Sequence, residues 1–549
     1  ELPTAVAEAP TQAEVMDAYE RVYGLIPNAR ENRSVGKRLA DLKMAVGEDR
    51  DIAGIEAPYD DAVALYESLL LDEATEGQDQ ILYQLGRAHD VVGNTEQAVI
   101  YLDRLINEHP QSDYAAEAHF RRAEIAFSRE QYAAAARDYR FVVDLGPSPY
   151  WQNATYMLGW SNFKQNDLEA GLASFFMVID ALLADTEAAD LAATDRELLT
   201  DSFRVVTLAL SYLDGPDTLA EQMHQLGRPD WQFGVYDALA KAYVEDERFL
   251  DSVNTWQRFI EENSLDARAP NAHIGMIDTL VGADFPSEIR PKKAEFVRRY
   301  GITSEFWVVH DAATRDSYST TLGEYLIELA EVAHGEAQTS GKPADFVAAA
   351  NWYEEIVATF PDDPATAQYV FLLGEVYTEA GEHGKAVAAY QRVVREFGDF
   401  PKANEAGYAA ILGLAELVAS APADELELWQ RLKIDAQIEF ALTFPEDQRA
   451  PAAQLDAADT LFGLAQYPEA LDLAQNLFLQ WPDVEPALRK PALLILGHGW
   501  FELQDFVAAE GAYRDALALQ LAADEQAKVN ERLLAVEWRK QELPALAAT

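Results

Sequence analysis

Histidines and carboxylates are the side chains of this sequence that could catalyse a reaction or bind a metal ion. The nine histidines are scattered, and none has another histidine three or four residues away, the spacing that a helical metal site requires. Carboxylate pairs such as Asp60-Asp61 and Asp362-Asp363 are expected in a chain with 94 acidic residues. Cysteine is absent, and the sequence contains no Gly-rich phosphate loop, His-Glu-x-x-His or Gly-x-Ser-x-Gly motif. We therefore predict that the chain is not an enzyme and has no cofactor, and we assign no metal-site residues. Whether the acidic loops bind metal ions stays open.

A second group of side chains suits recognition. Aromatic residues interspersed with a few charges can anchor peptides or stack on sugars. Such residues recur at helical spacing in three successive stretches: Tyr83, Arg87 and Asp90; Phe120, Glu124 and Phe127; and Asn153, Tyr156, Trp160, Phe163 and Lys164. A later, more acidic group consists of Gln368, Phe371, Glu375, Thr378 and Glu379. These residues can act together only if a regular framework brings them to one surface.

An internal repeat supplies that framework. Aligned units start at residues 79, 116 and 152, which are 37 and 36 residues apart and close to the ~34-residue tetratricopeptide period. The eighth place holds Gly86, Ala123 and Gly159, and the twentieth holds Ala98, Ala135 and Gly171. The twenty-fourth place holds the large residues Leu102, Tyr139 and Phe175. Further units follow from residues 233, 367, 451 and 490.

The small residues have a physical reason. Two antiparallel helices of one hairpin can approach closely only where Gly, Ala or Ser lies at their crossing. We expect the bulky residues of the second helix to fill the space against the next hairpin, and prolines such as Pro110 and Pro147 to end the second helices. The sequence thus predicts an all-α protein, a right-handed α-solenoid of tetratricopeptide-like helical hairpins.

Segments of the chain match the repeat to different degrees, and these differences suggest a division into five parts. We predict an N-terminal helical segment (1–60), an N-terminal arc of repeats (61–300), a joint (301–322), a C-terminal arc (323–522), and a capping helix with a tail (523–549). Degenerate hairpins are expected at 193–226, with Gly215-Pro216 as the turn, after Pro270, and at 404–444. Residues 301–318 lack a clear helical period.

In such solenoids the second, fifth, ninth, twelfth and thirteenth places of each first helix line a groove. This assigns Tyr83, Arg87, Phe120, Glu124, Asn153, Tyr156, Trp160, Lys164, Phe371, Glu375 and Glu379 to a partner-binding groove. Phe127 and Phe163 are expected to pack between hairpins, and for Tyr156 and Trp160 packing and groove exposure are both open. The fifth and ninth places lack the Lys and Asn of a carboxylate clamp, so an extended or helical segment is the expected ligand.

Charge narrows the class of partner. With 94 acidic and 43 basic residues, the formal net charge of the 549-residue chain is −51. Nucleic acid and anionic membrane surfaces are disfavoured, because binding them needs a basic surface. No apolar run is long enough to span a bilayer. The chain opens at Glu1-Leu2-Pro3 without Met, as expected after removal of a secretory signal or for a truncated chain, and the former together with the lack of cysteine favours a bacterial periplasm.

Several segments resemble a known family. Residues 81–90, 120–128 and 158–165, and residues 285–287 followed by 293–301, resemble the adventurous gliding-motility tetratricopeptide family of the Gram-negative envelope. The resemblance covers most of residues 60–310 and the rest more loosely. It implies a periplasmic scaffold within a trans-envelope machine, and it supplies no catalytic residues.

These observations predict a non-catalytic periplasmic scaffold that binds envelope or secreted proteins along its groove. Two alternatives remain open: a module that recognises polysaccharide or peptidoglycan through its aromatic residues, or the regulatory superhelix of an envelope enzyme. The sequence identifies neither the partner nor the oligomeric state.

Overall fold

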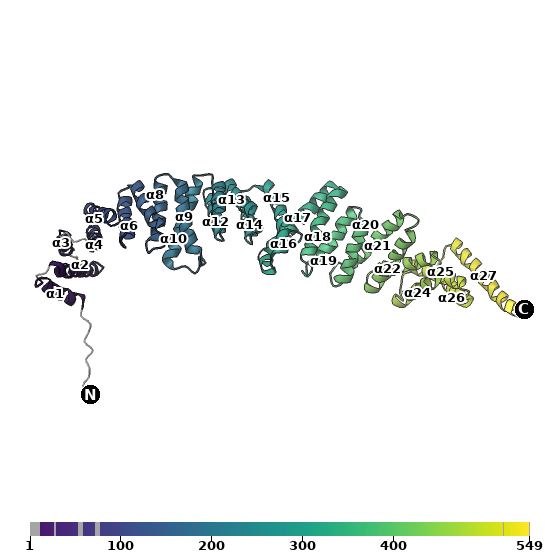
Figure 1. Ribbon diagram of the computed structural model, residues 1–549. Coiled ribbons are helices and arrows are strands. Elements are labelled where there is room, and N and C mark those ends of the chain that lie inside the picture. Colours follow the sequence, from purple (N-terminus) through teal and green to yellow (C-terminus); the bar gives the residue numbers. More distant parts are fainter. Residues whose placement is uncertain (1–10, 27–28, 53–58, 72–76, 520, 548–549) are drawn as a thin grey trace, which may run out of the picture. The chain divides into compact units, whose positions relative to one another are not determined.

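A computed structural model describes residues 11–26, 29–52, 59–71, 77–519 and 521–547 (Figure 1). These residues form α-helices joined by short turns, and no β-strand occurs among them. The predicted all-α class is confirmed. The helices belong to two compact units, Glu1–Ala283 and Asp284–Thr549.

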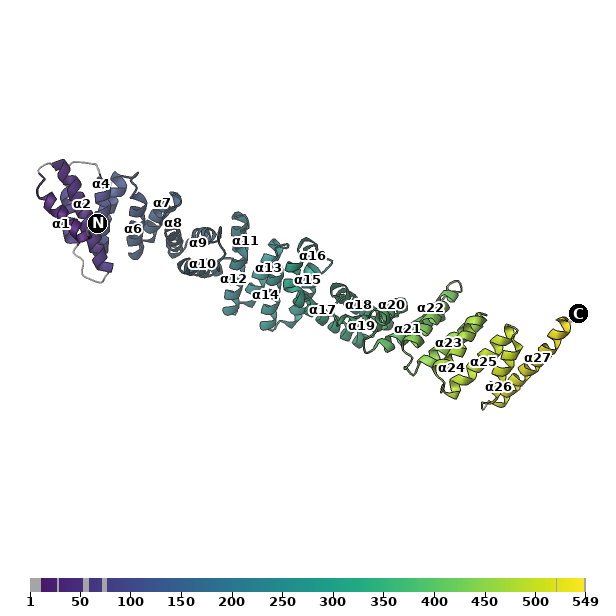
Figure 2. The ribbon, with the colours of Figure 1, turned by 90° about the horizontal axis from the view of Figure 1, so that it is seen from below.

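The first unit contains helices α1 to α14, which follow one another in chain order (Figures 1 and 2). Their bounds are α1 Gln12–Tyr23, α2 Ala29–Ile52, α3 Asp60–Leu70, α4 Gln78–Val91, α5 Thr95–Glu108, α6 Ala115–Ser128, α7 Tyr132–Asp144, α8 Trp151–Lys164, α9 Leu168–Leu183, α10 Ala193–Ser211, α11 Pro216–Gln225, α12 Gln232–Glu245, α13 Phe249–Glu262 and α14 Ala269–Gly282.

The second unit contains helices α15 to α27, again stacked in chain order (Figure 2). Their bounds are α15 Pro286–Tyr300, α16 Glu305–Val309, α17 Ala312–Ser340, α18 Pro343–Thr359, α19 Thr366–Glu379, α20 His383–Glu396, α21 Ala403–Ser420, α22 Leu426–Thr443, α23 Ala450–Gly463, α24 Tyr467–Gln480, α25 Pro486–Glu502, α26 Phe506–Leu517 and α27 Ala523–Ala547. The hairpins expected at 193–226 and 404–444 are present as α10–α11 and α21–α22.

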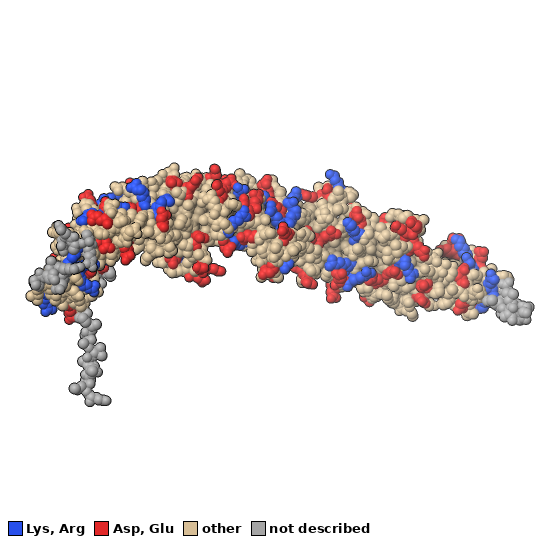
Figure 3. Space-filling model, in the orientation of Figure 1, with Lys and Arg blue, Asp and Glu red and all other residues tan. Residues whose placement is uncertain are grey.

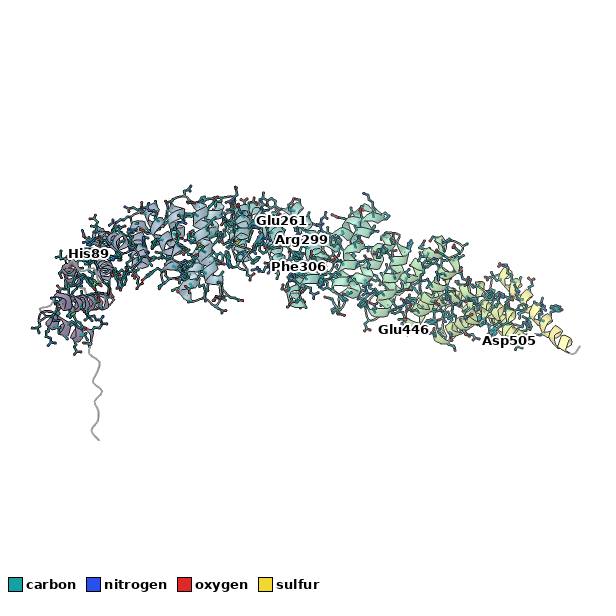
Figure 4. The ribbon with its side chains drawn as sticks, viewed as in Figure 1. His89, Glu261, Arg299, Phe306, Glu446 and Asp505 are labelled. Atoms are coloured by element: carbon teal, nitrogen blue, oxygen red, sulfur yellow. The ribbon has the colours of Figure 1, made fainter. Side chains whose placement is uncertain are left out.

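The regular hairpins are closed by tight turns and caps. One residue of the turn between the paired helices has a positive φ, for example Gly93, Asn166 or Gly381. Asp505 (labelled in Figure 4) caps α26 by accepting a hydrogen bond of 3.0 Å from the backbone N–H of Ala508. The sharp turn brings the second helix back along the first one.

Small residues let the two helices of a hairpin approach, as predicted, and a bulky residue of the second helix packs against them. A Cβ atom on Gly86 would lie 2.7 Å from Leu102 Cδ2, and one on Gly159 would lie 2.9 Å from Phe175 Cζ. The bulky twenty-fourth residue therefore packs on the eighth residue of its own hairpin. It also reaches the next hairpin, as predicted, because Leu102 shares a core cluster with Ala118 and Ile125 of α6. Tyr139 likewise shares a core cluster with Ala154 and Leu158 of α8. The side chain of the second helix occupies the volume that a Cβ would need.

Residues 301–322, predicted to be a joint without helical period, are largely helical. They include α16 and the start of α17, which Asp311 caps by accepting a hydrogen bond of 2.9 Å from the Thr314 N–H. Phe306 of α16 (Figure 4) lies in an aromatic cluster, with ring centroids 5.0 Å from Tyr300 and 5.8 Å from Tyr318. Phe306 thus anchors the short helix between α15 and α17. Whether the segment acts as a joint stays a prediction.

Candidate partner-binding surfaces

Two residues assigned to the groove are buried instead. Tyr83 on α4 is 5% exposed and Phe371 on α19 is 4% exposed. The residue that caps the next first helix covers each ring: Tyr114 stacks on Tyr83 at a centroid distance of 4.7 Å, and Lys402 Nζ lies 5.1 Å from the centroid of Phe371. The groove assignment of Tyr83 and Phe371 is therefore wrong, because these rings join successive hairpins.

The same arrangement recurs along both units. We call it the cap–ring contact, in which the N-cap residue of a first helix lies on an aromatic residue of an earlier first helix. Its five examples are Tyr114 on Tyr83, Tyr150 on Phe120, Arg268 on Phe233, Lys402 on Phe371 and Arg449 on Tyr408. Phe120, also assigned to the groove, is accordingly half-buried.

Two of these caps share a short sequence motif, Asp-x-Arg-Ala-Pro, at residues 266–270 and 447–451. Arg449 Nη2 lies 2.6 Å from Asp447 Oδ2, and its guanidinium lies 4.5 Å from the centroid of Tyr408. The hydrogen bonds from Arg449 hold the pKa of Asp447 well below its ordinary value. Searching the sequence for a repeated motif at the hairpin junctions would have found this contact.

A network of ion pairs crosses the first helices of the first unit. Arg87, a predicted groove residue, pairs with Glu48 of α2 at 2.9 Å. Asp90 on α4 lies 3.6 Å from Arg121 on α6, and Arg121 donates to Glu117 at 2.8 Å. The network therefore joins α2, α4 and α6 on one surface.

Glu117 extends this network through two tyrosines. The hydroxyl groups of Tyr83 and Tyr150 interact with its carboxylate and, against the effect of burial, help to lower the pKa of Glu117. Because Arg121 pairs with both Glu117 and Asp90, these side chains are held in place and the surface is preorganised without a ligand.

Tyr156 and Trp160, both on α8, are half-buried and form a second chain of contacts. The Trp160 side chain interacts with the Tyr156 hydroxyl, which donates a hydrogen bond to Asp201 on α10. Trp160 also packs edge-on against Phe175 with a centroid distance of 6.1 Å, and Lys164 Nζ lies 5.9 Å from its ring centroid. Packing and partial exposure are thus combined in these two residues.

The remaining predicted residues of the first unit are accessible to a partner. Glu124, Asn153 and Lys164 are exposed, and Glu124 lies beside the Arg121–Asp90 pair. Partial burial, and then the Asp90 charge, raise the pKa of Glu124. This carboxylate would gain from a cation brought by a partner. The sequence did not identify Glu117, Arg121 and Asp201, because no repeat position marks them.

In the second unit the predicted residues Glu375 and Glu379 form part of an acidic surface. Glu375 is half-buried and Glu379 is exposed. Burial raises the pKa of Glu375, and the charges of Glu405 and Glu379 raise it further, against the effect of Lys402. Acidic side chains are also widespread on the face visible in Figure 3.

Metal sites and membrane-spanning helices were considered for the described residues. No group of three or more histidine, aspartate or glutamate side chains in this part of the chain is arranged to hold a metal ion. Among the described helices, none combines the length and the apolar character needed to cross a bilayer.

Comparison with known proteins identifies the repeat. A family model described as tetratricopeptide repeat matches residues 83–149 and 344–401, one stretch in each unit. No curated protein matches the chain.

Three solved structures are among those similar to this chain. A structure of Naa15/Naa10 bound to HypK-THB has 13% identity, covers 98% of each chain and has a TM-score of 0.27. Yeast Tom70 has 13% identity, covers 92% of this chain and 96% of its own, and has a TM-score of 0.22. A tetratricopeptide repeat protein of Parabacteroides merdae has 15% identity, covers 47% of this chain and 91% of its own, and has a TM-score of 0.24. The family-model matches identify tetratricopeptide repeats at residues 83–149 and 344–401, in regions whose helices pack as the hairpins described above.

Proposed function

We propose that this protein is a non-catalytic scaffold that binds protein partners along the first helices of its hairpins. The observation that supports this most directly is the preorganised surface across α4, α6 and α8. There Arg121 and Glu117 hold each other in place and Tyr156 is hydrogen-bonded to Asp201, while Glu124, Asn153 and Lys164 remain accessible. A rigid surface with both charge signs suits an extended or helical segment of a partner, because little side-chain entropy is lost on binding.

We further propose that the protein acts in the periplasm of a Gram-negative bacterium, as part of a trans-envelope complex. The complete absence of cysteine in 549 residues is compatible with an oxidising compartment. The resemblance of residues 81–90, 120–128 and 158–165 to an envelope family supports the same assignment.

Site-specific photocrosslinking tests the binding surface. A photoreactive phenylalanine analogue at Asn153 or Lys164 is expected to crosslink one discrete protein partner in intact cells. The same analogue at Arg140, an exposed residue of the second helix α7, is the matched control and should give no such product. Equal crosslinking from all three positions, or none from Asn153 and Lys164, would contradict the assignment of this surface.

Two further measurements separate the alternatives. A polysaccharide reader would bind purified cell-wall glycan in a manner abolished by Trp160→Ala, and an enzyme would release soluble fragments from that glycan. Protease accessibility before and after opening the outer membrane tests the location. A protein that stays protected until the inner membrane is lysed would exclude the periplasm.

A further inference from the structure

A cavity of about 320 Å³ opens on the second unit where α17, α18 and α19 meet. Its apolar lining includes Ile327 of α17, Ile356 and Phe360 at the end of α18, and Tyr369 of α19. Gly323 keeps it open, since a Cβ there would lie 3.2 Å from Phe360 Cζ. The cavity can accept one aliphatic or aromatic side chain.

Carboxylates continue from this cavity across three first helices. Glu331 follows Ile327 by one turn of α17 and acts electrostatically on the Tyr369 hydroxyl at the cavity. The Tyr353 ring stacks on Tyr369 with a centroid distance of 6.3 Å, and Glu331 and Glu375 both act electrostatically on the Tyr353 hydroxyl.

These carboxylates extend to α21, because the pKa of Glu375 is raised by Glu405 of that helix and by Glu379 of its own helix. We call Glu331, Glu375, Glu379 and Glu405 the acidic wall. Glu331, Glu379 and Glu405 are exposed, so their charges face solvent and a partner can reach them.

The acidic wall is only partly neutralised within the chain. Lys402 influences Glu375, but its ammonium also lies over the Phe371 ring as one of the cap–ring contacts. Repulsion between the wall carboxylates is therefore relieved most effectively by cations that a partner supplies.

We propose that the cavity and the acidic wall together bind a linear segment of a partner protein that carries one bulky apolar side chain followed by several Lys or Arg residues. The apolar side chain enters the cavity, and the basic residues lie along Glu331, Glu375 and Glu379. This inference rests on the proposed protein-binding function and specifies the chemistry of the partner. Charge complementarity distinguishes this segment from acidic peptides and from nucleic acid, which the wall repels.

Fluorescence anisotropy with defined peptides tests the proposal. The probe is a fluorescein-labelled peptide with one Leu followed by four Lys in a Gly-Ser background, titrated with the full chain at low salt. We expect saturable binding that weakens about tenfold or more when the probe's Leu is replaced by Ser, or when salt is raised. A probe with Glu in place of Lys should not bind.

Protein variants locate the contact. The triple variant Glu331→Gln, Glu375→Gln, Glu379→Gln should lower the affinity about tenfold or more, and Ile327→Asn should remove the preference for Leu over Ser. A matched control removes three exposed carboxylates of the same unit away from the wall, through Glu469→Gln, Asp472→Asn and Asp483→Asn. This control should leave binding nearly unchanged. The glutamine variants alter surface carboxylates, so their melting curves serve as the check on folding.

Two outcomes would overturn the proposal. Equal loss of affinity in the wall variant and in the control would mean that the basic probe responds only to the net charge of −51. Failure of the probe to bind would exclude this class of segment. In either case, partner crosslinking from Asn153 and Lys164 in the first unit would still report on the proposed function, so the two conclusions can fail separately.

Discussion

The stretches α4–α8 and α19–α23 join successive hairpins in the same place but with different side chains. In the first stretch aromatic caps lie on aromatic rings, as Tyr114 does on Tyr83 and Tyr150 does on Phe120. In the second stretch cations do so, as Lys402 does on Phe371 and Arg449 does on Tyr408. The position of the cap residue over the ring is common to both stretches, and either an aromatic or a cationic side chain can occupy it.

This difference makes the two stretches respond differently to solution conditions. Stacked rings depend mainly on apolar burial, which salt does not screen. A cation over a ring and the Asp447–Arg449 ion pair both weaken as salt is added. The second stretch should therefore be the more salt-sensitive of the two.

The largest effect is expected inside the hairpins, where both stretches are alike. Gly159→Leu in the first unit and Gly374→Leu in the second should each destabilise the protein by about 3 kcal/mol, because the new side chain collides with Phe175 or Tyr390. Urea denaturation followed by circular dichroism measures this loss. Gly384→Leu, where a Cβ meets no atom within 4 Å, is the control and should cost much less. Unchanged unfolding of both test variants would mean that the hairpin packing is wrong.

Removing a cap residue should cost less stability than the glycine substitutions, and the salt dependence of that cost should differ between the two stretches. Arg449→Ala should cost about 2 kcal/mol, because it leaves the Asp447 carboxylate, which is only 7% exposed, without its guanidinium partner. Tyr114→Ala should cost about 1 kcal/mol through lost stacking. In 1 M NaCl the penalty of Arg449→Ala should shrink, while that of Tyr114→Ala should not.

The intermediate variant Arg449→Lys sharpens this comparison. It keeps the charge but not the two parallel hydrogen bonds to Asp447, so its stability should lie between those of the wild type and Arg449→Ala. If salt changes the stability loss of Arg449→Ala and that of Tyr114→Ala equally, then cationic and aromatic caps do not differ in their electrostatic contribution to stability.

The smallest expected effect is the change of stability when the pH is lowered. Burial lowers the pKa of His334 and His498 in the second unit and of His89 in the first, from an ordinary value of 6.5. As the pH falls below that value, the unfolded chain binds protons before the folded chain does. These histidines therefore reduce stability on the acid side and have no effect well above it.

Hydrogen exchange can measure this effect in the second unit. Going from pH 7.5 to pH 5.5, wild-type protein should lose protection in α17–α18 and α25–α26 relative to the His334→Gln, His498→Gln variant. Comparison with a variant is needed because carboxylates with raised pKa, such as Glu124 and Glu375, act in the opposite direction. Identical pH dependence of variant and wild type would contradict the histidine contribution.

Much of the fold could be predicted from the sequence, because small residues at the hairpin crossings follow a fixed period. Gly86, Gly159 and Gly374 mark the crossings directly. The helical start of α17 was missed, since its signal is a single capping aspartate, Asp311, rather than a period.

The candidate surface was less predictable, because a repeat position states where a side chain points and not what lies on it. Tyr83 and Phe371 occupy groove places, yet each ring is covered by a cap residue. That cap residue lies more than thirty positions further along the chain in both cases. The exposure of Glu124 and Lys164 agrees with their assignment, but their role in binding stays a prediction.

The cap–ring contacts also give the array a direction. Each ring on an earlier hairpin is shielded by a residue that arrives with a later one, so melting a hairpin exposes an aromatic surface on its predecessor. The stability of each repeat thus depends on its C-terminal neighbour in the manner of a one-dimensional nearest-neighbour chain. Loss of either hairpin removes the same cap–ring contact, so a hairpin that unfolds at the end of a unit lowers the stability of the hairpin next to it.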